Sequence, residues 1–500
     1  MEITILNSDL QKVVFFDKDA NILFMSKTHV FQATVRSYHQ LLKSKGLNPV
    51  VQEVAMDVIE GKRKLQAEDN AEKAERSEMQ RIATEIFRKA VLKRASDIHI
   101  RVATKTKTTI LFRIHNDLEQ QQEHPSSWGK FLCSAIYTAM SDISDATYEE
   151  LSRQDGRISS RDKLPPGLDG IRIATTPQVD GNLMVLRLLY NDANQSNDIC
   201  RLGYAQDQKD LVSLMKRRPT GINIIAGPTG SGKSTTLQRT LLSIHEDCKG
   251  TKHIITVEDP PEYPMAGIVQ TPVANANTEE ERSAAFQEAI KSSMRLDPNV
   301  IMIGEMRDTP SARLGIQAAM TGHQVWTTVH ANSAFAILDR MIDMGVPLNT
   351  MTDPTIVTGL ICQRLLKVLC PKCKKPLTNV IHNYSNEDQE RVLSVIDLST
   401  AHAKGDGCPN CGDSGIVGRT VVAEVIVPDQ VMMGFFKRGN KERAIEHWRA
   451  RGGRSMLDLA IQKINAGICD PFLAEDEVGP LNYTVETSVT GERTNDRRQN

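Results

Sequence analysis

One short stretch of this sequence combines glycines, a lysine and hydroxyl side chains in an order that suits phosphate groups. Residues 227–235 read Gly-Pro-Thr-Gly-Ser-Gly-Lys-Ser-Thr and fit the pattern G-x-x-x-x-G-K-[ST]. Glycines let backbone N–H groups approach phosphate oxygens, Lys233 reaches the β- and γ-phosphates, and Ser234 offers a hydroxyl to Mg²⁺. The predicted nucleotide-binding residues are Gly227, Pro228, Thr229, Gly230, Ser231, Gly232, Lys233, Ser234 and Thr235.

The segments on either side of this loop have the sequence patterns of the strand and the helix that a phosphate-binding loop connects. An apolar run at residues 222–225 predicts a buried strand, and residues 235–245 carry leucines at helical spacing. A strand, a glycine turn and a helix N-terminus together aim several N–H groups and the positive end of a helix dipole at one point. The sequence therefore predicts a nucleoside triphosphate site.

Three further apolar runs, at residues 254–257, 300–303 and 325–329, each end in polar side chains. In an open parallel sheet, ligands bind beyond the carboxyl ends of the strands, and the glycine loop also follows such an end. We therefore expect one edge of the sheet to gather the chemically capable side chains around one nucleotide. They are Lys233, Ser234, Glu258, Glu262, Glu305 and His330.

These side chains suit phosphoryl transfer to water, which needs a cation, a group that orients the water and donors for the phosphate charge. Glu305 is the candidate for orienting or deprotonating the water, because it follows a fully apolar strand. Glu258 and Glu262 are candidates for holding Mg²⁺ through its waters. His323 and His330 each remain open between a structural histidine and a phosphate sensor.

Two C-x-x-C pairs form a second group with chemical potential. Cys370, Cys373, Cys408 and Cys411 have the spacing of a zinc knuckle, and four thiolates around tetrahedral Zn²⁺ leave no open position. The expected role of this zinc is therefore structural. The odd total of nine cysteines with two tight pairs indicates metal ligands in a reducing compartment rather than a disulfide framework.

Composition places the chain among soluble globular proteins of the cytoplasm. Charged residues make up 25 % and hydrophobic residues 40 %, and no segment approaches the roughly 18 apolar residues of a membrane span. The N-terminus lacks the basic and apolar regions of a signal peptide. A net charge of −1, without a stripe of basic and aromatic residues, argues against nucleic acid as a partner and against a helicase.

The chain divides by pattern into several parts. Residues 205–365 alternate strand and helix, which predicts a parallel α/β sheet, and strands at 98–102, 109–114, 170–175 and 183–189 with a helix near 127–141 predict an α+β domain before it. An amphipathic helix is expected from about residue 78, with Met79, Ile82, Ile86 and Ala90 on one face. The full division is a small N-terminal module without an assigned role (1–60), a charged linker (61–80), an α+β domain (81–203), an ATPase domain (204–365), a four-cysteine zinc module (366–425), a helical C-terminal subdomain (426–480) and a disordered tail (481–500).

Taken together, the motifs resemble those of the secretion and pilus-assembly ATPase superfamily. Residues 227–236, 255–262, 296–308 and 321–332 are similar to its Walker A, Asp box, Walker B and His box. Residues 95–99, 154–157, 171–173 and 185–189 resemble the domain that precedes the motor, and 360–365 the stretch after the His box. The similarity covers about residues 80–480, in the order that the family uses.

This resemblance implies a RecA-like P-loop motor with a parallel sheet, preceded by a PAS-like α+β domain and followed by a small zinc module and a helical C-terminus. It also implies a homo-hexamer with one ATP between the two domains of each subunit. By the resemblance, Glu258 and Glu262 belong to the Asp box, and Glu305 is the catalytic glutamate. The remaining implied residues are His323 and His330 of the His box, and Arg157 and Arg172, which reach the phosphates from the N-terminal domain.

Four positions depart from the family pattern without removing a core catalytic group, and they indicate a divergent branch. Lys291 stands where the family often has arginine, and the change loses bidentate hydrogen bonding. Asn299 replaces an aspartate before the Walker B strand, and Ala331 and Ser333 replace a threonine and an aspartate after His330.

The paired cysteines, with residues 415–420, resemble the extension motors of this superfamily. That resemblance implies a peripheral inner-membrane ATPase that assembles a type IV pilus or type II secretion pseudopilus through a polytopic platform protein and a membrane-associated docking protein. A pilus-retraction motor, or a type IV secretion or conjugative translocation motor, is the first alternative, against which the cysteine module and near-neutral charge argue. A non-hydrolysing nucleotide-binding scaffold is another, and it predicts damage at Lys233 or Glu305, where both residues are intact.

Overall fold

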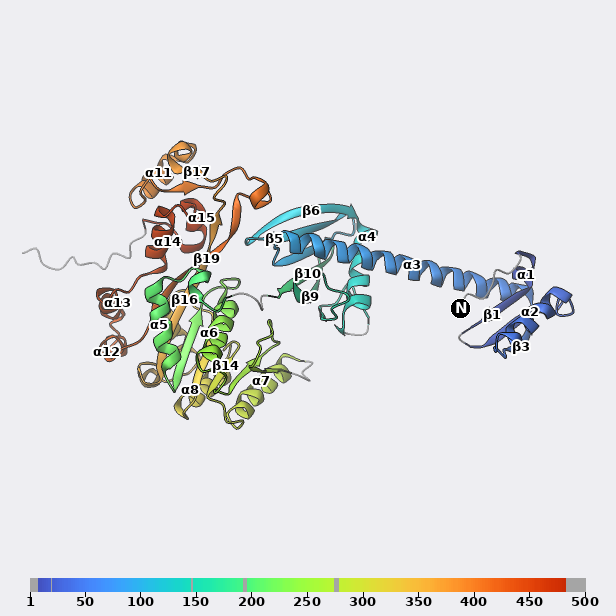
Figure 1. The fold of residues 1–500 in the computed structure, drawn as a ribbon, viewed down its shortest axis with the longest axis horizontal. Coiled ribbons are helices and arrows are strands. Elements are labelled where there is room, and N and C mark those ends of the chain that lie inside the picture. Colours follow the sequence, from blue (N-terminus) through green and yellow to red (C-terminus); the bar gives the residue numbers. More distant parts are fainter. Residues whose placement is uncertain (1–7, 19, 145–146, 192–195, 274–277, 483–500) are drawn as a thin grey trace, which may run out of the picture.

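The computed structural model describes residues 8–18, 20–144, 147–191, 196–273 and 278–482. The molecule is elongated, with a small N-terminal module at one end of a long helix and the two larger sheets, with the C-terminal helices, at the other (Figure 1). Most of the tail expected at 481–500 lies outside the described residues.

The N-terminal module is a three-stranded sheet with two helices. Strands β1 (Val14–Asp17) and β2 (Ile22–Ser26) pair antiparallel. Strand β3 (Val50–Val54) adds in parallel to β2. Helices α1 (Ser8–Val13) and α2 (Ala33–Ser44) contribute the apolar side chains of a small core.

Helix α3 (Met56–Leu92) connects this module to the next domain. The charged segment predicted as a linker is therefore helical, and the 37 residues span about 55 Å at 1.5 Å per residue. Its C-terminal half buries Met79, Ile86 and Ala90 in the next core, with Ile82 packed beside them, so the predicted stripe is confirmed. The helix holds the N-terminal module away from the motor (Figure 1).

The second domain is a seven-stranded antiparallel sheet in the order β6-β5-β4-β10-β9-β8-β7. Helices α3 and α4 (Ser126–Ser134), with a π-helix at Ala135–Met140, supply side chains to the core on one face. The polar strand β6 was not predicted, because its glutamines and glutamates lack the apolar alternation of a half-buried strand. The strands are β4 (Asp97–Val102), β5 (Lys107–Ile114), β6 (Asp117–Pro125), β7 (Ile143–Ser144), β8 (Gln154–Ile158), β9 (Leu168–Gln178) and β10 (Gly181–Tyr190).

Arginines stand side by side on the other face of this sheet. Arg157 of β8 is paired in register with Arg172 of β9, and Arg172 with Arg187 of β10. Arg187 is in turn paired with Asp97 of β4, and its Nε lies 3.0 Å from an oxygen of that buried carboxylate. A row of three arginines therefore crosses β8, β9 and β10 on the face of the sheet that does not pack on α3 and α4.

The motor domain is a seven-stranded sheet in the order β13-β12-β14-β15-β11-β16-β19, with helices on both faces. All neighbouring pairs are parallel except β16 and β19, so the predicted α/β fold is confirmed. The strands are β11 (Gly221–Ala226), β12 (Ile254–Glu258), β13 (Val269–Pro272), β14 (Val300–Ile303), β15 (Gln324–Val329), β16 (Val357–Leu369) and β19 (Ile416–Ile426). The helices are α5 (Gln206–Arg217), α6 (Lys233–Asp247), α7 (Glu279–Ser293), α8 (Thr309–Met320), α9 (Ala334–Asp343) and α10 (Leu348–Met351).

The cysteine module interrupts the motor sheet rather than following it. Strand β16 continues past the boundary predicted at residue 365, and β19 returns as the seventh strand, antiparallel to β16. The reason is burial: Leu366 and Leu369 of β16 and Val422 of β19 are core residues. The insertion contains the short strands β17 (Lys375–Pro376) and β18 (His402–Ala403) and helix α11 (Asn386–Leu393).

Four helices end the part of the chain that the structure describes, and they pack mainly against the core shared with β16 and β19. They are α12 (Gln430–Lys437), α13 (Lys441–Ala450), α14 (Met456–Asn465) and α15 (Pro471–Val478). The helical C-terminus expected from the sequence is thus confirmed. Among the described residues, no helix combines the length and apolar character needed to cross a bilayer.

Candidate nucleotide site between two domains

The glycine loop joins the end of β11 to the start of α6, as predicted. Gly232 precedes the helix with a φ of +84°, in the left-handed region that favours glycine. At Gly227 a Cβ atom would lie 2.4 Å from the backbone oxygen of Gln363, so only glycine fits there. Ser234 is exposed in the first turn of α6, where its hydroxyl is accessible.

Lys233 folds its ammonium group back over the loop. Its Nζ donates to the backbone oxygens of Gly227 at 2.9 Å and of Pro228 at 3.1 Å. Burial lowers the pKa of Lys233, while the nearby carboxylates of Glu305 and Glu262 act in the opposite direction. The lysine and both acids therefore lie within electrostatic reach of one another at the predicted edge of the sheet.

Glu305 is held at both carboxylate oxygens. Its Oε1 lies 2.9 Å from Nε2 of His330, and its Oε2 lies 3.0 Å from the guanidinium of Arg307. His330 follows β15 and Glu305 follows β14, and these strands are parallel neighbours. The structure thus brings Glu305 and His330 together as the strand pattern predicts.

The two acids after β12 have different surroundings. Glu258 is buried, and its Oε1 accepts from Oγ1 of Thr256 at 2.6 Å and from Nε2 of Gln270 at 2.9 Å. Burial raises the pKa of Glu258, and the two hydrogen bonds oppose that rise. Glu262 is more exposed and faces the neighbouring domain. Of the pair, Glu262 is the freer to meet a ligand.

Arg172 reaches this acidic loop from the preceding domain. Its NH2 donates to the backbone oxygen of Pro260 at 2.6 Å, and its NH1 lies 3.8 Å from Oε1 of Glu262. Arg157 stands beside it, and its buried Nε finds no hydrogen-bond partner within the described part of the chain. Here Arg172 binds the loop after β12, next to the place where the phosphates are expected.

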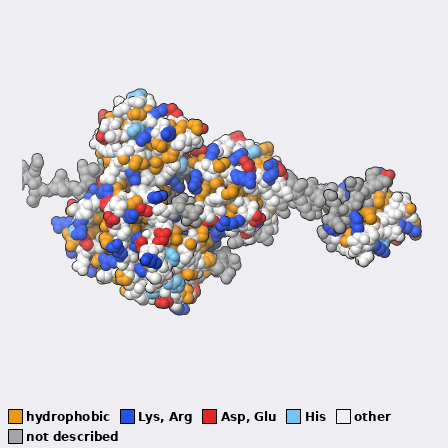
Figure 2. Space-filling view, in the orientation of Figure 1, with side chains coloured by type: hydrophobic (Ala, Val, Ile, Leu, Met, Phe, Trp, Pro, Cys, Tyr) orange, Lys and Arg blue, Asp and Glu red, His pale blue; other side chains and the backbone are white. Residues whose placement is uncertain are grey.

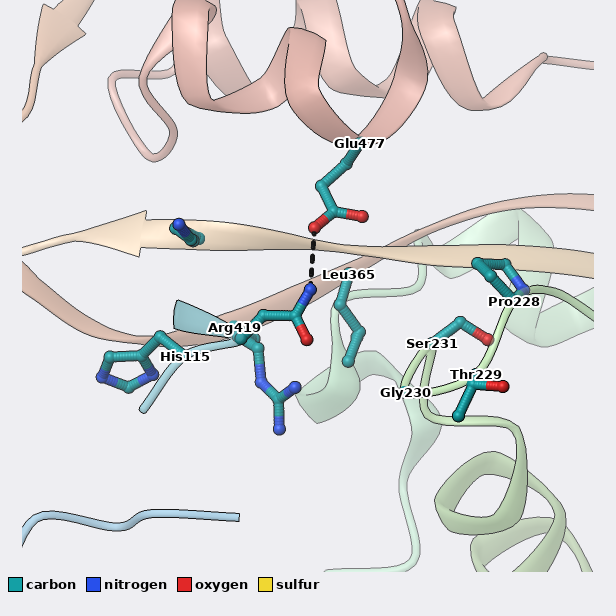
Figure 3. Close-up of a pocket in the computed structure, with 10 residues that line it drawn as sticks. His115, Pro228, Thr229, Gly230, Ser231, Leu365, Arg419 and Glu477 are labelled. Carbon is teal, nitrogen blue, oxygen red and sulfur yellow. Dashed lines mark hydrogen bonds between the residues drawn. The ribbon is translucent and has the colours of Figure 1, made fainter. Parts of the chain in front are cut away.

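A second contact between the domains lies at the tip of the glycine loop. The β5–β6 turn carries Asn116, whose Nδ2 donates to Oε1 of Glu477 at 3.4 Å, the dashed line in Figure 3. Beside it, Nζ of Lys367 lies 2.6 Å from Oδ2 of Asp117. The turn, the loop and the strand ends enclose about 20 Å³. Its lining residues are His115, Asn116, Pro228, Thr229, Gly230, Ser231, Leu365, Lys367, Arg419 and Glu477. The second domain, which contains β4–β10, therefore contacts the motor domain at the tip of the glycine loop as well as at Glu262.

His323 is not part of this group. His323 precedes β15 and His330 follows it, so the two histidines lie at opposite ends of the same strand. Its Nδ1 lies 3.0 Å from the backbone oxygen of Ala318 at the end of α8. Six residues of extended strand separate the two ends by about 20 Å, so within one chain the structure favours the structural histidine over the phosphate sensor at His323.

Sequence reasoning missed three polar residues around the site, of which Gln363 and Tyr204 are buried and Glu424 is partly buried. Beside the glycine loop, the hydroxyl of Tyr204 donates a hydrogen bond of 2.6 Å to Oε1 of Gln363. Glu424 of β19 accepts from the backbone N–H of Ala334 at 2.8 Å, at the start of the helix that follows the His330 segment. The only available signal was a polar residue inside an apolar run, as at residues 356–369 and 420–427.

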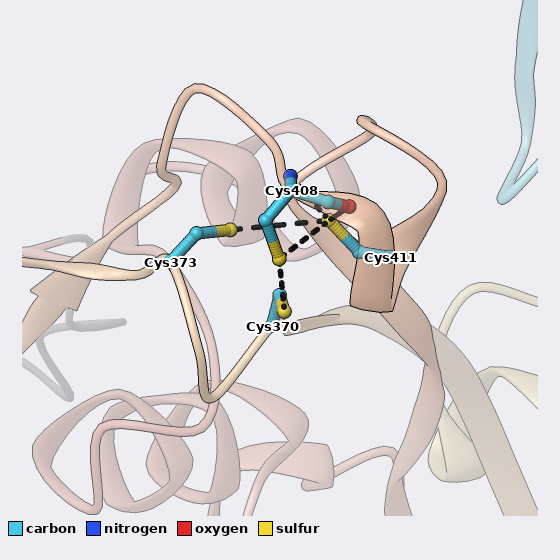
Figure 4. A group of neighbouring side chains, drawn as sticks. All are labelled: Cys370, Cys373, Cys408 and Cys411. Atoms are coloured by element: carbon cyan, nitrogen blue, oxygen red, sulfur yellow. Dashed lines mark hydrogen bonds between the residues drawn. The ribbon is translucent and has the colours of Figure 1, made fainter.

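The four cysteines converge as the spacing predicts (Figure 4). The Sγ–Sγ distances are 3.7 Å for Cys370 and Cys408, 3.9 Å for Cys373 and Cys411, and 3.8 Å for Cys408 and Cys411. A tetrahedron with Zn–S bonds of about 2.3 Å has edges of about 3.8 Å. Backbone N–H groups of Cys408 and Gly415 each lie 3.2 Å from Sγ of Cys411. The donor set and its dimensions fit Zn²⁺.

Comparison with known proteins agrees with this geometry. A family model described as "Type II/IV secretion system protein" matches residues 72–479, which include both domains, the cysteine module and α15. The chain belongs to this family, the ATPases of secretion and pilus assembly. It is accordingly an ATP hydrolase.

Individual relatives of this secretion ATPase are similar over most of their length. The chain is 34 % identical to type II secretion system protein E of Pseudomonas aeruginosa, over 81 % of this chain and 76 % of that protein. It is 31 % identical to the type IV pilus assembly ATPase PilB of Myxococcus xanthus, over 87 % of this chain and 75 % of that protein.

Solved structures share the fold. A crystal structure of the pilus retraction motor PilT with bound ADP aligns with a TM-score of 0.51 at 23 % identity, over 79 % of this chain and 96 % of that one. The ATPase DotB of Legionella pneumophila aligns with a TM-score of 0.52 at 18 % identity, over 77 % and 92 %. The chain thus shares its fold with these two solved ATPases over more than three quarters of its length.

Proposed function

We propose that this ATPase drives assembly of a type IV pilus or a type II secretion pseudopilus. The observation that carries the proposal is the four-cysteine cluster inserted between β16 and β19, because extension motors are the branch that the paired cysteines resemble. The similarity to type II secretion protein E and to PilB, over three quarters of each relative, supports the same branch.

In the proposed site, Lys233 neutralises charge on the β- and γ-phosphates, and Ser234 with Glu262 and Glu258 serves Mg²⁺, directly or through its waters. Glu305 orients the attacking water or takes its proton, with His330 and Arg307 fixing its carboxylate. Arg172 moves from the acidic loop, and Arg157 from the neighbouring strand β8, toward the phosphates when the two domains close. Their position on a separate domain supports this role, since closure strengthens each charge contact.

The active form in this proposal is a homo-hexamer that acts at the inner membrane. Rotation between the two domains pushes on a polytopic platform protein, and a docking protein holds the ring at the membrane. The N-terminal module on its long helix suits such docking, because α3 carries it clear of the motor (Figure 1). The zinc ion would hold the cysteine module together and take no part in hydrolysis.

Nucleic acid is not a proposed partner. Lysines and arginines are interspersed with aspartates and glutamates over the face shown in Figure 2. A protein that tracks a nucleic-acid strand uses a continuous basic groove with stacking aromatic residues. The mixed charge of this face, with the net charge of −1 for the whole chain, favours the assembly motor over a DNA-translocating motor of the same fold.

Deletion of the gene in its own host tests the proposal. We expect surface fibres, or the secreted substrate, to disappear and to return with the wild-type gene but not with Lys233→Ala. A retraction motor gives the opposite phenotype, because its loss leaves fibres in place and stops their disassembly. Unchanged fibres and unchanged secretion would contradict an assembly function, while ATP hydrolysis by the purified protein would be unaffected by that result.

A further inference from the structure

A phosphate-binding loop works only if its peptide groups face the right way. Its N–H groups must point toward the phosphates, and any carbonyl oxygen turned inward would repel them. In a trans peptide the C=O of one residue and the N–H of the next point in opposite directions. The orientation of the Ser231 carbonyl therefore decides where the N–H of Gly232 points.

Gln363 holds that carbonyl. It lies on β16, one residue beyond the last pairing with β11, and its side chain is 0 % exposed. Its Nε2 donates to the backbone oxygen of Ser231 at 2.7 Å, and a Cβ atom on Gly232 would lie 3.2 Å from the same nitrogen. The amide thus packs directly against the peptide between Ser231 and Gly232.

Tyr204 fixes the orientation of the amide. Its hydroxyl donates to Oε1 of Gln363 at 2.6 Å, and burial raises the pKa of this hydroxyl, so it stays protonated. If the amide were flipped, its oxygen would face the Ser231 oxygen and both favourable contacts would be lost. Only one orientation of Gln363 satisfies both neighbours.

Tyr204 also stands where the connection from the N-terminal domain enters the motor. The last strand of that domain ends at Tyr190, and Gly203 precedes Tyr204 with its carbonyl oxygen 2.9 Å from Nζ of Lys463. A chain of hydrogen bonds therefore runs from the entry of the interdomain connection to the phosphate-binding loop.

We propose that Gln363 is a positioning residue for ATP hydrolysis, which turns the Ser231–Gly232 peptide so that its N–H faces the phosphates, and that Tyr204 locks Gln363 in this orientation. The inference rests on the family's ATP hydrolysis and on these contacts, and not on the assembly role proposed above. Both side chains act through the loop and touch no substrate.

The test compares Gln363→Leu, Tyr204→Phe and the double variant in the full-length protein. Mg-ADP affinity is measured by titration calorimetry, and kcat and KM for Mg-ATP are measured separately. We expect Gln363→Leu to weaken Mg-ADP binding by about tenfold to a hundredfold, and Tyr204→Phe by about twofold to tenfold. KM should rise more than kcat falls, and the double variant should bind as Gln363→Leu does, because the hydroxyl acts only through the amide.

Gln324→Leu is the matched control. Gln324 is a buried glutamine at the start of β15, so it lies at the end of the strand away from the phosphate-binding loop. Its Nε2 donates to the backbone oxygens of Met215 and Arg218. Its loss should lower thermal stability and leave Mg-ADP affinity unchanged. Wild-type affinity in folded Gln363→Leu would overturn the proposal. If that variant does not fold, wild-type affinity in Tyr204→Phe would overturn it equally, as would fully additive effects of the two substitutions.

Discussion

Nε2 of His330 lies 2.9 Å from Oε1 of Glu305, at the carboxyl ends of two adjacent strands of the motor sheet. The guanidinium of Arg307 lies 3.0 Å from the other oxygen of the same carboxylate. Glu305 is therefore held in one orientation by groups from two motifs, and it lies within electrostatic reach of the lysine of the phosphate-binding loop. This arrangement suits a carboxylate that positions a water molecule beside a phosphate.

Loss of the loop lysine should abolish hydrolysis. In Lys233→Ala the backbone amides remain, but the charge on the β- and γ-phosphates is left uncompensated. We expect no ATP hydrolysis above background in a steady-state phosphate-release assay. Lys437→Ala, at the exposed end of α12, is the control and should hydrolyse ATP normally. A near wild-type rate in Lys233→Ala would remove this lysine from the mechanism.

The arginines of the N-terminal domain should matter for turnover more than for binding. Arg172 contacts the loop at Pro260 and Glu262 from outside the motor, so Arg172→Ala should lower kcat by at least about tenfold and change Mg-ADP affinity little. Arg101→Ala removes an exposed arginine from the same sheet face and serves as control. A fragment that begins near residue 200 should bind nucleotide and hydrolyse it poorly, and full activity in that fragment would contradict the proposed role of both Arg157 and Arg172.

Much of this site could be predicted because it depends on local pattern. A glycine loop after an apolar run, and acids after three more such runs, must meet at one edge of a parallel sheet. The route of β16 and β19 could not be predicted, because the cysteine pairs marked a boundary where the strands in fact continue. The roles of Gln363 and Glu424 could not be predicted for another reason. Each bonds to a backbone group more than 80 residues away in sequence, and motif spacing carries no information on such contacts.

The cysteine module should hold one zinc ion per chain. Cys373→Ser with Cys408→Ser should release the metal and destabilise the module, because zinc binding supplies much of the folding energy of such small units. Because the module lies between β16 and β19, thermal unfolding of the motor should also occur at a lower temperature. Mg-ADP binding should survive, while fibre assembly in cells should fail.

Metal analysis of the purified protein checks this prediction directly. Cys200→Ser removes a cysteine outside the cluster and should keep its zinc. A zinc content near zero in intact wild-type protein would contradict the zinc assignment, and with it the main reason for preferring an assembly motor.

Glu424 should make stability depend on pH. Burial raises the pKa of Glu424 in the folded protein, so the folded state binds its proton more tightly than the unfolded chain does. The stabilisation of the folded state by this tighter proton binding is fully present below the unfolded-state pKa of about 4.3. It is lost as pH rises through the pKa of Glu424 in the folded protein. The free energy of unfolding of the wild type should therefore fall relative to Glu424→Gln as pH rises from about 4, by at most about 1.4 kcal/mol per pH unit.

Urea unfolding at a series of pH values measures this difference. Glu446→Gln, at an exposed position of α13, is the control and should give a curve parallel to that of the wild type. Parallel curves for the wild type and Glu424→Gln would show that Glu424 titrates alike in the folded and unfolded states, against the prediction.

Hydrolysis by Glu305→Gln tests the central claim most directly. The substitution keeps the shape of the side chain and removes its negative charge, so an interaction needed in the transition state is lost while the binding surface remains. Mg-ATP affinity and single-turnover hydrolysis should be measured on the same purified sample. We expect nucleotide affinity close to that of the wild type, with turnover lower by orders of magnitude. Affinity and turnover that fall together would make Glu305 a Mg²⁺ ligand or a structural residue, and would contradict its role at the attacking water.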